Sequence, residues 1–177
     1  MKEKKIVHRD LKPDNILIKY ENNNKYIAKI CDYGISKIGN FTKLITRIGT
    51  LNYMAPEIIQ LTEEGNYNYK CDLWSLGIII YELFFKERPY KGLSEYAILE
   101  EIKKFGKTKI KKTNDEKLDD LINKLLEKEP EKRISWDEYL NHPFFKAITN
   151  SKDFTNKINN EPINKKNEKK MKKMLKK

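Results

Sequence analysis

Four polar side chains near the start of the chain have the chemistry of a group-transfer site. Asp10 is a carboxylate that can orient a hydroxyl group and accept its proton, and Lys12 is a point charge two residues later. Asn15 and Asp32 offer oxygen atoms, which Mg²⁺ prefers as ligands. A carboxylate, a cation and a Mg²⁺ site are the parts that phosphoryl transfer to a hydroxyl requires.

These residues belong to short motifs that follow one another along the chain. Residues 8–15 read His-Arg-Asp-Leu-Lys-Pro-Asp-Asn, and residues 32–34 read Asp-Tyr-Gly. Residues 49–57 read Gly-Thr-Leu-Asn-Tyr-Met-Ala-Pro-Glu, residues 72–77 read Asp-Leu-Trp-Ser-Leu-Gly, and Arg133 closes a Glu-Pro-Glu-Lys-Arg segment. Such an ordered series over residues 8–145 is far more specific than any one of its members.

The series resembles the motifs of eukaryotic protein kinases of the serine/threonine type, H-R-D-L-x-x-x-N, D-F-G and A-P-E, with Tyr33 in place of phenylalanine. The resemblance implies a protein serine/threonine kinase that transfers phosphate from ATP to hydroxyls of protein substrates. It implies ATP and Mg²⁺ as cofactors and Asp10 and Lys12 as the catalytic residues. Lys12, Asn15 and Asp32 would bind the cofactors, with Asn15 and Asp32 on the metal.

The resemblance also gives roles to residues outside the chemistry. Thr46 matches a site that many relatives phosphorylate, so an upstream kinase is an expected partner, and the new phosphate could pair with Arg9. The alternative is that Thr46 is one of several loop hydroxyls. Structural roles fall to four more residues: Thr50 bonds the catalytic aspartate and lysine, Asp72 accepts backbone hydrogen bonds from the catalytic loop, and Glu57 pairs with Arg133.

The expected fold is mainly α: the C-lobe of a protein kinase, made of a short β-hairpin and a helical bundle. Residues 1–145 form this partial kinase domain. Residues 16–18 and 26–31 read as the two strands, which bring Asn15 and Asp32 close together. No segment resembles the glycine-rich loop or the strand lysine of an N-lobe, so the N-lobe is expected to be absent. The isolated chain should therefore bind ATP weakly and be inactive.

Four helices are expected in the bundle. Residues 72–85 are apolar almost all round, which predicts a buried helix, too short to span a membrane. Apolar faces left exposed on it would favour aggregation or a partner. Ser94 caps a helix that ends near residues 105–106, and the leucine stripe over residues 118–126 predicts an amphipathic one. Ser135 and Glu138 form a capping box for a last helix that stops at residues 142–145.

Charge is distributed unevenly along the chain. Its formal net charge is +11, with 38% apolar and 36% charged residues, which excludes a membrane-embedded protein. Residues 146–177 are rich in lysine and asparagine and are expected to be a disordered basic tail. Cys31 and Cys71 do not suit a zinc site, and a reducing, cytoplasmic location is expected. Nuclear localisation through the tail is the alternative.

Two readings of the function therefore remain. The favoured one is a fragment of a serine/threonine kinase, because the residues of an active enzyme are all present. The other is a non-catalytic half-kinase that binds substrates or regulators. A nucleic-acid partner rests on the tail alone and is not expected.

Overall fold

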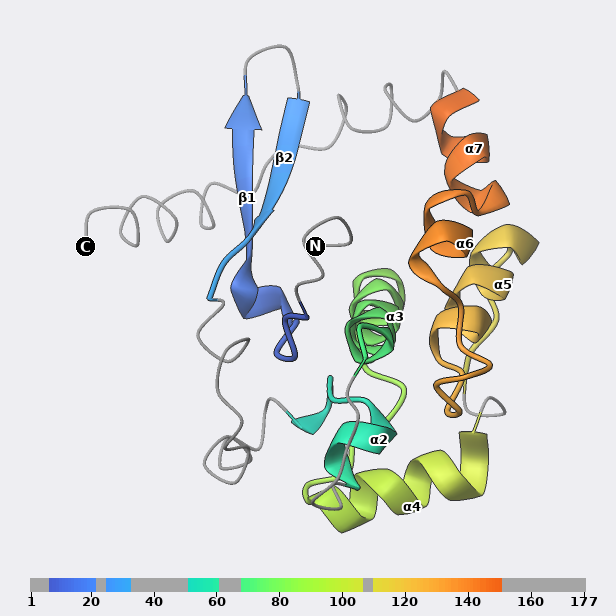
Figure 1. Cartoon of the computed structure of the whole chain (residues 1–177). Coiled ribbons are helices and arrows are strands. Elements are labelled where there is room, and N and C mark those ends of the chain that lie inside the picture. The colour runs from blue at the N-terminus through green and yellow to red at the C-terminus, as the bar shows by residue number, and fades with distance from the viewer. Residues whose placement is uncertain (1–6, 22–24, 33–50, 61–67, 107–109, 151–177) are drawn as a thin grey trace.

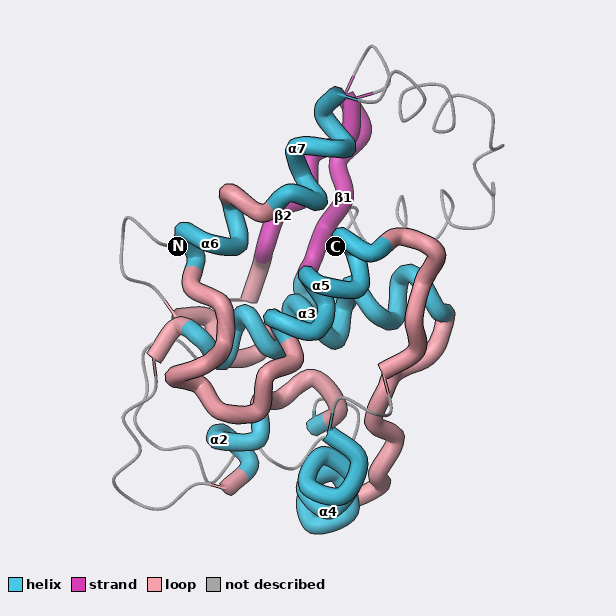
Figure 2. Tube along the Cα trace, turned by 90° about the vertical axis from the view of Figure 1, so that its right-hand side faces the viewer, coloured by secondary structure: helices cyan, strands magenta, loops and turns pink. Residues whose placement is uncertain are grey.

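The computed structural model describes residues 7–21, 25–32, 51–60, 68–106 and 110–150. A β-hairpin stands on one side of the molecule, and the helix α3 (Lys70–Phe85) runs through its middle (Figure 1). On the other side lie α5 (Glu116–Leu125), α6 (Trp136–Leu140) and α7 (Pro143–Asn150). Helices α2 (Pro56–Ile59) and α4 (Glu95–Phe105) pack together at the lower edge in both views (Figures 1 and 2).

The hairpin follows directly on the polar loop at residues 8–12. A short 3-10 helix, η1 (Pro13–Asn15), leads into β1 (Ile16–Glu21), which pairs antiparallel with β2 (Lys25–Ile30). The strands cover more of the hairpin than the predicted 16–18 and 26–31, and β2 ends before Cys31. Tyr20 and Tyr26 lie opposite each other with ring centroids 5.2 Å apart, a cross-strand contact that stabilises the outer end of the hairpin.

The helix α3 is the centre of the packing, as its apolar sequence predicts. Leu73 and Ile78 are fully buried on it, and both hydrophobic clusters of the molecule contain residues of α3. The helix ends at Lys86, which takes the left-handed conformation at φ 59° and donates its N–H to the carbonyl of Glu82. The last turn is different: Leu83 is 63% exposed and Phe84 52%, so apolar surface does remain uncovered there.

The caps of α4, α5 and α6 are side chains. The Ser94 hydroxyl accepts from the N–H of Ala97 at the start of α4, as expected. The Ser135–Glu138 capping box of α6 is complete, with both reciprocal hydrogen bonds present. Asp115, which sequence reasoning missed, caps α5. On α5 the expected stripe is the buried face: Leu118, Leu121, Ile122 and Leu125.

One predicted helix end was wrong and one helix was missed, both near proline. The sequence placed the end of the last helix at residues 142–145, whereas α6 ends at Leu140 and α7 begins at Pro143. Pro56 likewise opens α2, a helix that was not predicted. Proline fits the first turn of a helix, where its missing N–H has no partner to lose. The boundary expected after residue 145 therefore falls inside α7, while the tail from residue 151 lies outside the described residues.

Within the described ranges, no helix combines the length and the apolar character that crossing a bilayer requires.

Close packing of α3 on α5 depends on a glycine. A Cβ atom at Gly77 would lie 2.8 Å from the Cβ of Leu125 and 2.8 Å from a methyl of Leu126. We therefore expect Gly77→Ala to lower the free energy of unfolding by about 1–3 kcal/mol through overpacking. The gain in helix propensity, about 0.5–1 kcal/mol, is too small to offset this loss.

Urea unfolding followed by circular dichroism measures the change. Leu83→Ala on the exposed turn of the same helix is the control and should change stability by no more than about 0.5 kcal/mol. A Gly77→Ala variant as stable as the starting protein would contradict the packing described here.

Candidate active site

A carboxylate on α3 holds the polar loop at residues 8–12 in place. The backbone N–H groups of His8 and Arg9 each donate a hydrogen bond of 2.8 Å to Asp72, one to each carboxylate oxygen. Arg9 has φ 70°, a left-handed conformation that costs a non-glycine residue roughly 1–3 kcal/mol. The two hydrogen bonds from neighbouring residues to one side chain fix this turn, and thereby the direction in which Asp10 leaves it.

Asp72 itself is fully buried in the first turn of α3. Burial raises the pKa of its carboxyl above the usual range, because the charged form loses its hydration. The hydrogen bonds from His8 and Arg9 act in the opposite direction and favour the charged form. The loop and the carboxylate thus depend on each other. The sequence resemblance implied a contact between Asp72 and this loop, and the structure contains it.

His8 connects the loop to the far strand of the hairpin. Its ring is fully buried, Nδ1 lies 3.3 Å from the N–H of Asp10, and Nε2 lies 3.0 Å from the carbonyl oxygen of Cys31. Since Nδ1 accepts from a backbone N–H, the proton of the neutral ring belongs on Nε2, which donates to Cys31. His8 therefore ties the position of Asp10 to that of Asp32, a structural role that leaves it no part in acid–base chemistry.

Asp10 has one carboxylate oxygen with two hydrogen bonds and one that is buried without a partner. Oδ2 accepts from Lys12 Nζ at 2.7 Å and from Asn15 Nδ2 at 3.2 Å. Oδ1 is buried and has no hydrogen-bond partner among the residues that the structure describes. A buried acceptor without a partner is costly, so such atoms in native proteins call for an explanation. The arrangement can orient a hydroxyl group that enters beside Lys12.

Asn15 and Asp32 both lie at the base of the hairpin. The N–H of Cys31 donates to the backbone carbonyl of Asn15 at 2.9 Å, which sets Asp32 one residue beyond this bond. The Asn15 amide nitrogen donates to the backbone oxygen of Asp10 at 2.8 Å, so its amide oxygen is the atom left for a ligand. Asp32 is exposed and has φ 62°. One amide oxygen and one carboxylate fit Mg²⁺, which keeps water or phosphate oxygens as its other ligands.

A larger metal cage is not built here. The described parts of the chain contain no group of three or more His, Cys, Asp or Glu side chains that could hold a metal ion. A cation at this site would therefore depend on ligands brought by a bound nucleotide or by water.

An ion pair fixes α2, the helix that follows the loop at residues 51–55. Arg133 donates to Glu57 through both terminal nitrogens, at 2.6 and 2.9 Å, which is the pairing the resemblance implied. The Arg133 side chain is 0% exposed and its guanidinium lies 5.2 Å from the centre of the Trp74 ring. It also donates to the backbone oxygens of Lys70 and Glu127. With the carbonyl of Lys128 as a further acceptor, each N–H of this buried guanidinium has a hydrogen-bond partner.

Two further contacts on the 51–55 loop were not predicted. The Ser75 hydroxyl on α3 donates to the carbonyl of Tyr53 at 2.8 Å, and the Tyr53 hydroxyl donates to Glu82 at 2.5 Å. Burial and the neighbouring Glu82 raise the pKa of Tyr53, which keeps its hydroxyl protonated. Ser75 and Tyr53 both belong to motifs that the sequence analysis identified. A motif alone, however, does not predict which residue each of them contacts. They attach the loop to α3 at two points.

Three of the residues singled out in the sequence, Tyr33, Thr46 and Thr50, lie outside the described residues. The structure brings the others together in two groups, each of which contacts the first turns of α3. One group contains Arg9, Asp10, Lys12, Asn15 and Asp72, with Asp32 one residue beyond the bond from Cys31 to Asn15, and the other contains Glu57 and Arg133.

We expect Glu57→Ala to destabilise the chain strongly. It would leave the fully buried Arg133 guanidinium without a counter-charge, which costs about 3–5 kcal/mol for a buried pair. Thermal unfolding of the variant measures the effect. Glu131→Ala removes an exposed carboxylate from the loop before Arg133 and should have little effect. Equal melting temperatures for the two variants would show that the ion pair is not needed.

Comparison with known proteins agrees with this geometry. The family model of the protein kinase domain matches residues 1–145. Calcium-dependent protein kinase 4 of Plasmodium falciparum is 39% identical over 161 residues, covering 88% of this chain and 29% of its own length. The serine/threonine-protein kinase nekl-2 of Caenorhabditis elegans is 40% identical over 146 residues, covering 81% of this chain and 39% of its own length.

A solved structure is similar as well. The crystal structure of the Rad53 kinase domain and SCD2 matches with a TM-score of 0.62 and 30% sequence identity, over 82% of this chain and 51% of that chain. The chain thus spans well under half the length of the two curated relatives, 29% and 39%. Its described residues have the mainly helical fold with one two-stranded hairpin that the sequence predicted for a kinase C-lobe. On the family model and these relatives together, the chain belongs to the protein kinase family.

Proposed function

We propose that this chain forms the substrate-orienting and metal-binding part of a serine/threonine protein kinase, which in its complete form transfers phosphate from ATP to protein hydroxyls. The observation that carries the proposal is the state of Asp10. Its Oδ2 is held by Lys12 and Asn15 while its buried Oδ1 has no partner in the described part of the chain. A fixed acceptor that still lacks a hydrogen-bond donor suits an incoming serine or threonine hydroxyl.

Each residue of the loop has a separate task in this proposal. Asp10 accepts the hydrogen bond of the substrate hydroxyl at Oδ1 and so aims its oxygen. Lys12, which is already 2.7 Å from Asp10, neutralises negative charge next to the reacting oxygen. Asp72 takes no part in the chemistry and acts by holding the backbone of His8 and Arg9.

Protein kinases generally use ATP and Mg²⁺, and the residues present fit that pair. Asn15 and Asp32 would bind Mg²⁺, and Lys12 would contact the phosphates of ATP. When bound, the ion neutralises charge on the phosphate oxygens. Of the protein groups, Asn15 is fixed in advance by its hydrogen bonds to Asp10, at 2.8 and 3.2 Å, whereas Asp32 is exposed.

Regulation through Thr46 is part of the same proposal. An upstream kinase would phosphorylate Thr46, and the phosphate would pair with Arg9, whose backbone Asp72 holds next to Asp10. We propose a cytoplasmic location, which suits the two free thiols of Cys31 and Cys71, with nuclear import through the basic tail as the alternative.

The second candidate is a non-catalytic half-kinase that binds substrates or regulators. Exposed apolar side chains favour it: Leu83 and Phe84 on α3, and Leu17 and Ile18 on the hairpin at 47% and 48% exposure. Exposed apolar surface of this kind marks sites of protein–protein contact, and a regulatory partner could bury it. The two candidate functions differ in whether they require the carboxylate of Asp10.

The decisive test uses the full-length natural protein that contains this chain. With labelled ATP, Mg²⁺ and casein as substrate, Asp10→Asn should lower the rate of phosphate transfer by about 10²–10⁴-fold, the usual contribution of such a group. Asp14→Asn, an exposed carboxylate in the same loop, is the matched control and should leave the rate unchanged. An Asp10→Asn protein that labels casein at the original rate would overturn the proposal.

A second measurement addresses the 177-residue chain by itself. We expect calorimetric titration with Mg²⁺ and ATP to show no binding in the micromolar range, because the described residues offer two metal ligands and one phosphate contact. Micromolar affinity that Asp32→Asn abolishes would contradict this expectation.

A further inference from the structure

Two buried side-chain oxygens in the described part of the chain have no hydrogen-bond donor, and both lie on loops that α3 holds. One is Oδ1 of Asp10, the acceptor on which the proposed function rests, and the other is Oδ1 of Asn52. Native proteins pair nearly all of their buried polar atoms, because an acceptor without a donor loses its hydration and gains nothing in return. The reaction described above accounts for the acceptor on Asp10, whereas nothing in it uses Asn52.

Asn52 is held in a fixed turn among apolar side chains. It is 6% exposed, and its neighbours Leu51, Tyr53 and Met54 are buried as well. The N–H of Met54 donates to the carbonyl of Leu51 at 3.1 Å, which closes a turn with Asn52 and Tyr53 at its centre. The Ser75 hydroxyl fixes this turn to α3 through the carbonyl of Tyr53. The backbone that carries Asn52 therefore has little freedom to move.

The turn lies beside the polar loop that carries Asp10. Asp72 holds the backbone of the polar loop, and Ser75 holds the carbonyl of Tyr53. Residues three apart on an α-helix are neighbours on one face, with Cβ atoms about 5–6 Å apart. The polar loop and the turn are therefore attached to the same face of α3, one helical turn apart.

The charges around the turn agree with this placement. Burial and the bonded Glu82 raise the pKa of Tyr53, and the charge of Asp14, four residues after Asp10, adds to the rise. Glu82 itself already accepts from the Tyr53 hydroxyl and lies 3.9 Å from Arg88. Its charge is therefore already used within the chain.

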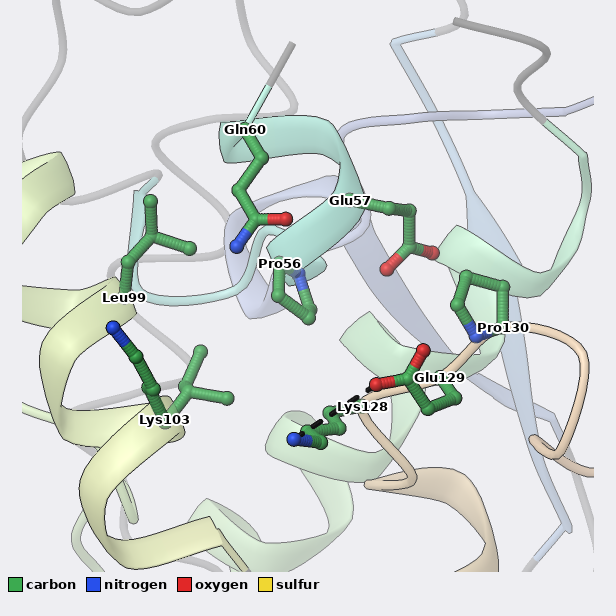
Figure 3. A pocket seen from close by; sticks show the side chains of 9 residues that line it. Pro56, Glu57, Gln60, Leu99, Lys103, Lys128, Glu129 and Pro130 are labelled. Atoms are coloured by element: carbon green, nitrogen blue, oxygen red, sulfur yellow. Dashed lines mark ion pairs between the residues drawn. The ribbon is translucent and has the colours of Figure 1, made fainter.

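The pocket between α2 and α4 does not account for the acceptor of Asn52. Figure 3 shows this pocket between Pro56 and Gln60 of α2 and Leu99 and Lys103 of α4. Asn52 is not among its lining residues, so a molecule held there would not contact Oδ1. The missing donor is therefore expected from a molecule bound at the polar loop and the turn.

We infer that Asn52 is a substrate-binding residue whose Oδ1 accepts a hydrogen bond from a main-chain N–H of the substrate peptide, near the hydroxyl that Asp10 orients. The inference rests on the proposed function and extends it to the backbone of the substrate. An extended peptide has main-chain N–H groups without internal partners, so it brings the donor that Asn52 lacks. A neutral amide among apolar side chains suits a neutral donor, because a charged side chain would lose its hydration there.

The test measures phosphate transfer by the full-length natural protein to a synthetic casein peptide that contains the labelled residue. Asn52→Leu keeps the branched shape of the side chain and removes both polar atoms. It should raise the KM for the peptide about three- to tenfold, the effect of one neutral hydrogen bond, and leave kcat and the KM for ATP unchanged. The matched control is Asn123→Leu, which removes an amide bound to the carbonyl of Asp119 on α5 and should change none of these constants.

Peptides with one N-methyl group each identify the donor. The methyl group removes a single main-chain N–H of the casein peptide. At one position it should lower kcat/KM about three- to tenfold with the original protein and much less with Asn52→Leu, because the acceptor of that N–H is already gone. Equal losses in both proteins at every position would overturn the inference.

Stability separates substrate binding from a structural role. Removal of a buried acceptor that has no donor should leave the melting temperature of the 177-residue chain unchanged or raise it. A residue that holds the loop together would lower the melting temperature when it is replaced. An Asn52→Leu chain that melts below the original chain would therefore contradict the inference.

The inference and the proposed function can fail separately. If the Asp10→Asn protein labels casein at the original rate, the proposed function fails and the inference fails with it. If Asp10 is required and Asn52→Leu has the original KM for the peptide, the inference alone fails.

Discussion

The hydrogen bonds from the backbone of His8 and Arg9 to Asp72 are the contact on which the candidate active site depends. A loop residue in the left-handed conformation and a carboxylate buried in a helix are each unfavourable alone. Together they satisfy each other, because the turn at Arg9 presents two N–H groups to the two carboxylate oxygens at 2.8 Å. The fixed turn sets the direction of Asp10, whose Oδ2 accepts from Asn15 and whose buried Oδ1 has no partner among the described residues.

The same helix also positions the opposite side of the site. Asp72, Trp74 and Ser75 are neighbours on α3, yet they contact three different segments: the loop at residues 8–10, the guanidinium of Arg133, and the carbonyl of Tyr53. Since α3 is rigid and buried, the distance between the loop that bears Asp10 and the loop that ends at α2 is fixed by one element. A rigid support of this kind limits the geometric freedom of groups that must meet a substrate together.

Sequence reasoning predicted the elements whose signals are local and missed those that depend on partners. The Leu118–Leu125 stripe and the Ser135 cap were readable because their contacts lie within one or two turns. The motifs likewise gave the partners of Asp72 and Glu57, through the resemblance. The bond from Tyr53 to Glu82 could not be predicted, because it joins residues far apart in the chain without a repeating pattern. The helix at Pro56 was missed and the helix end near Pro143 was misplaced, because proline both ends and begins helices.

The two buried charged groups, Asp72 and Arg133, are better understood as positioning devices than as sources of stability. Replacing a buried ion pair by apolar residues of similar volume is often neutral or stabilising, because both charges lose their hydration on burial. An apolar side chain at Asp72, however, would leave the N–H groups of His8 and Arg9 without acceptors and free the turn at φ 70°. One at Arg133 would break the 2.6 Å bond to Glu57, and would thereby release α2 and the end of the loop at residues 51–55. Both charged side chains therefore fix the positions of loops through directional hydrogen bonds. Hydrophobic packing is not directional and cannot fix these positions in the same way.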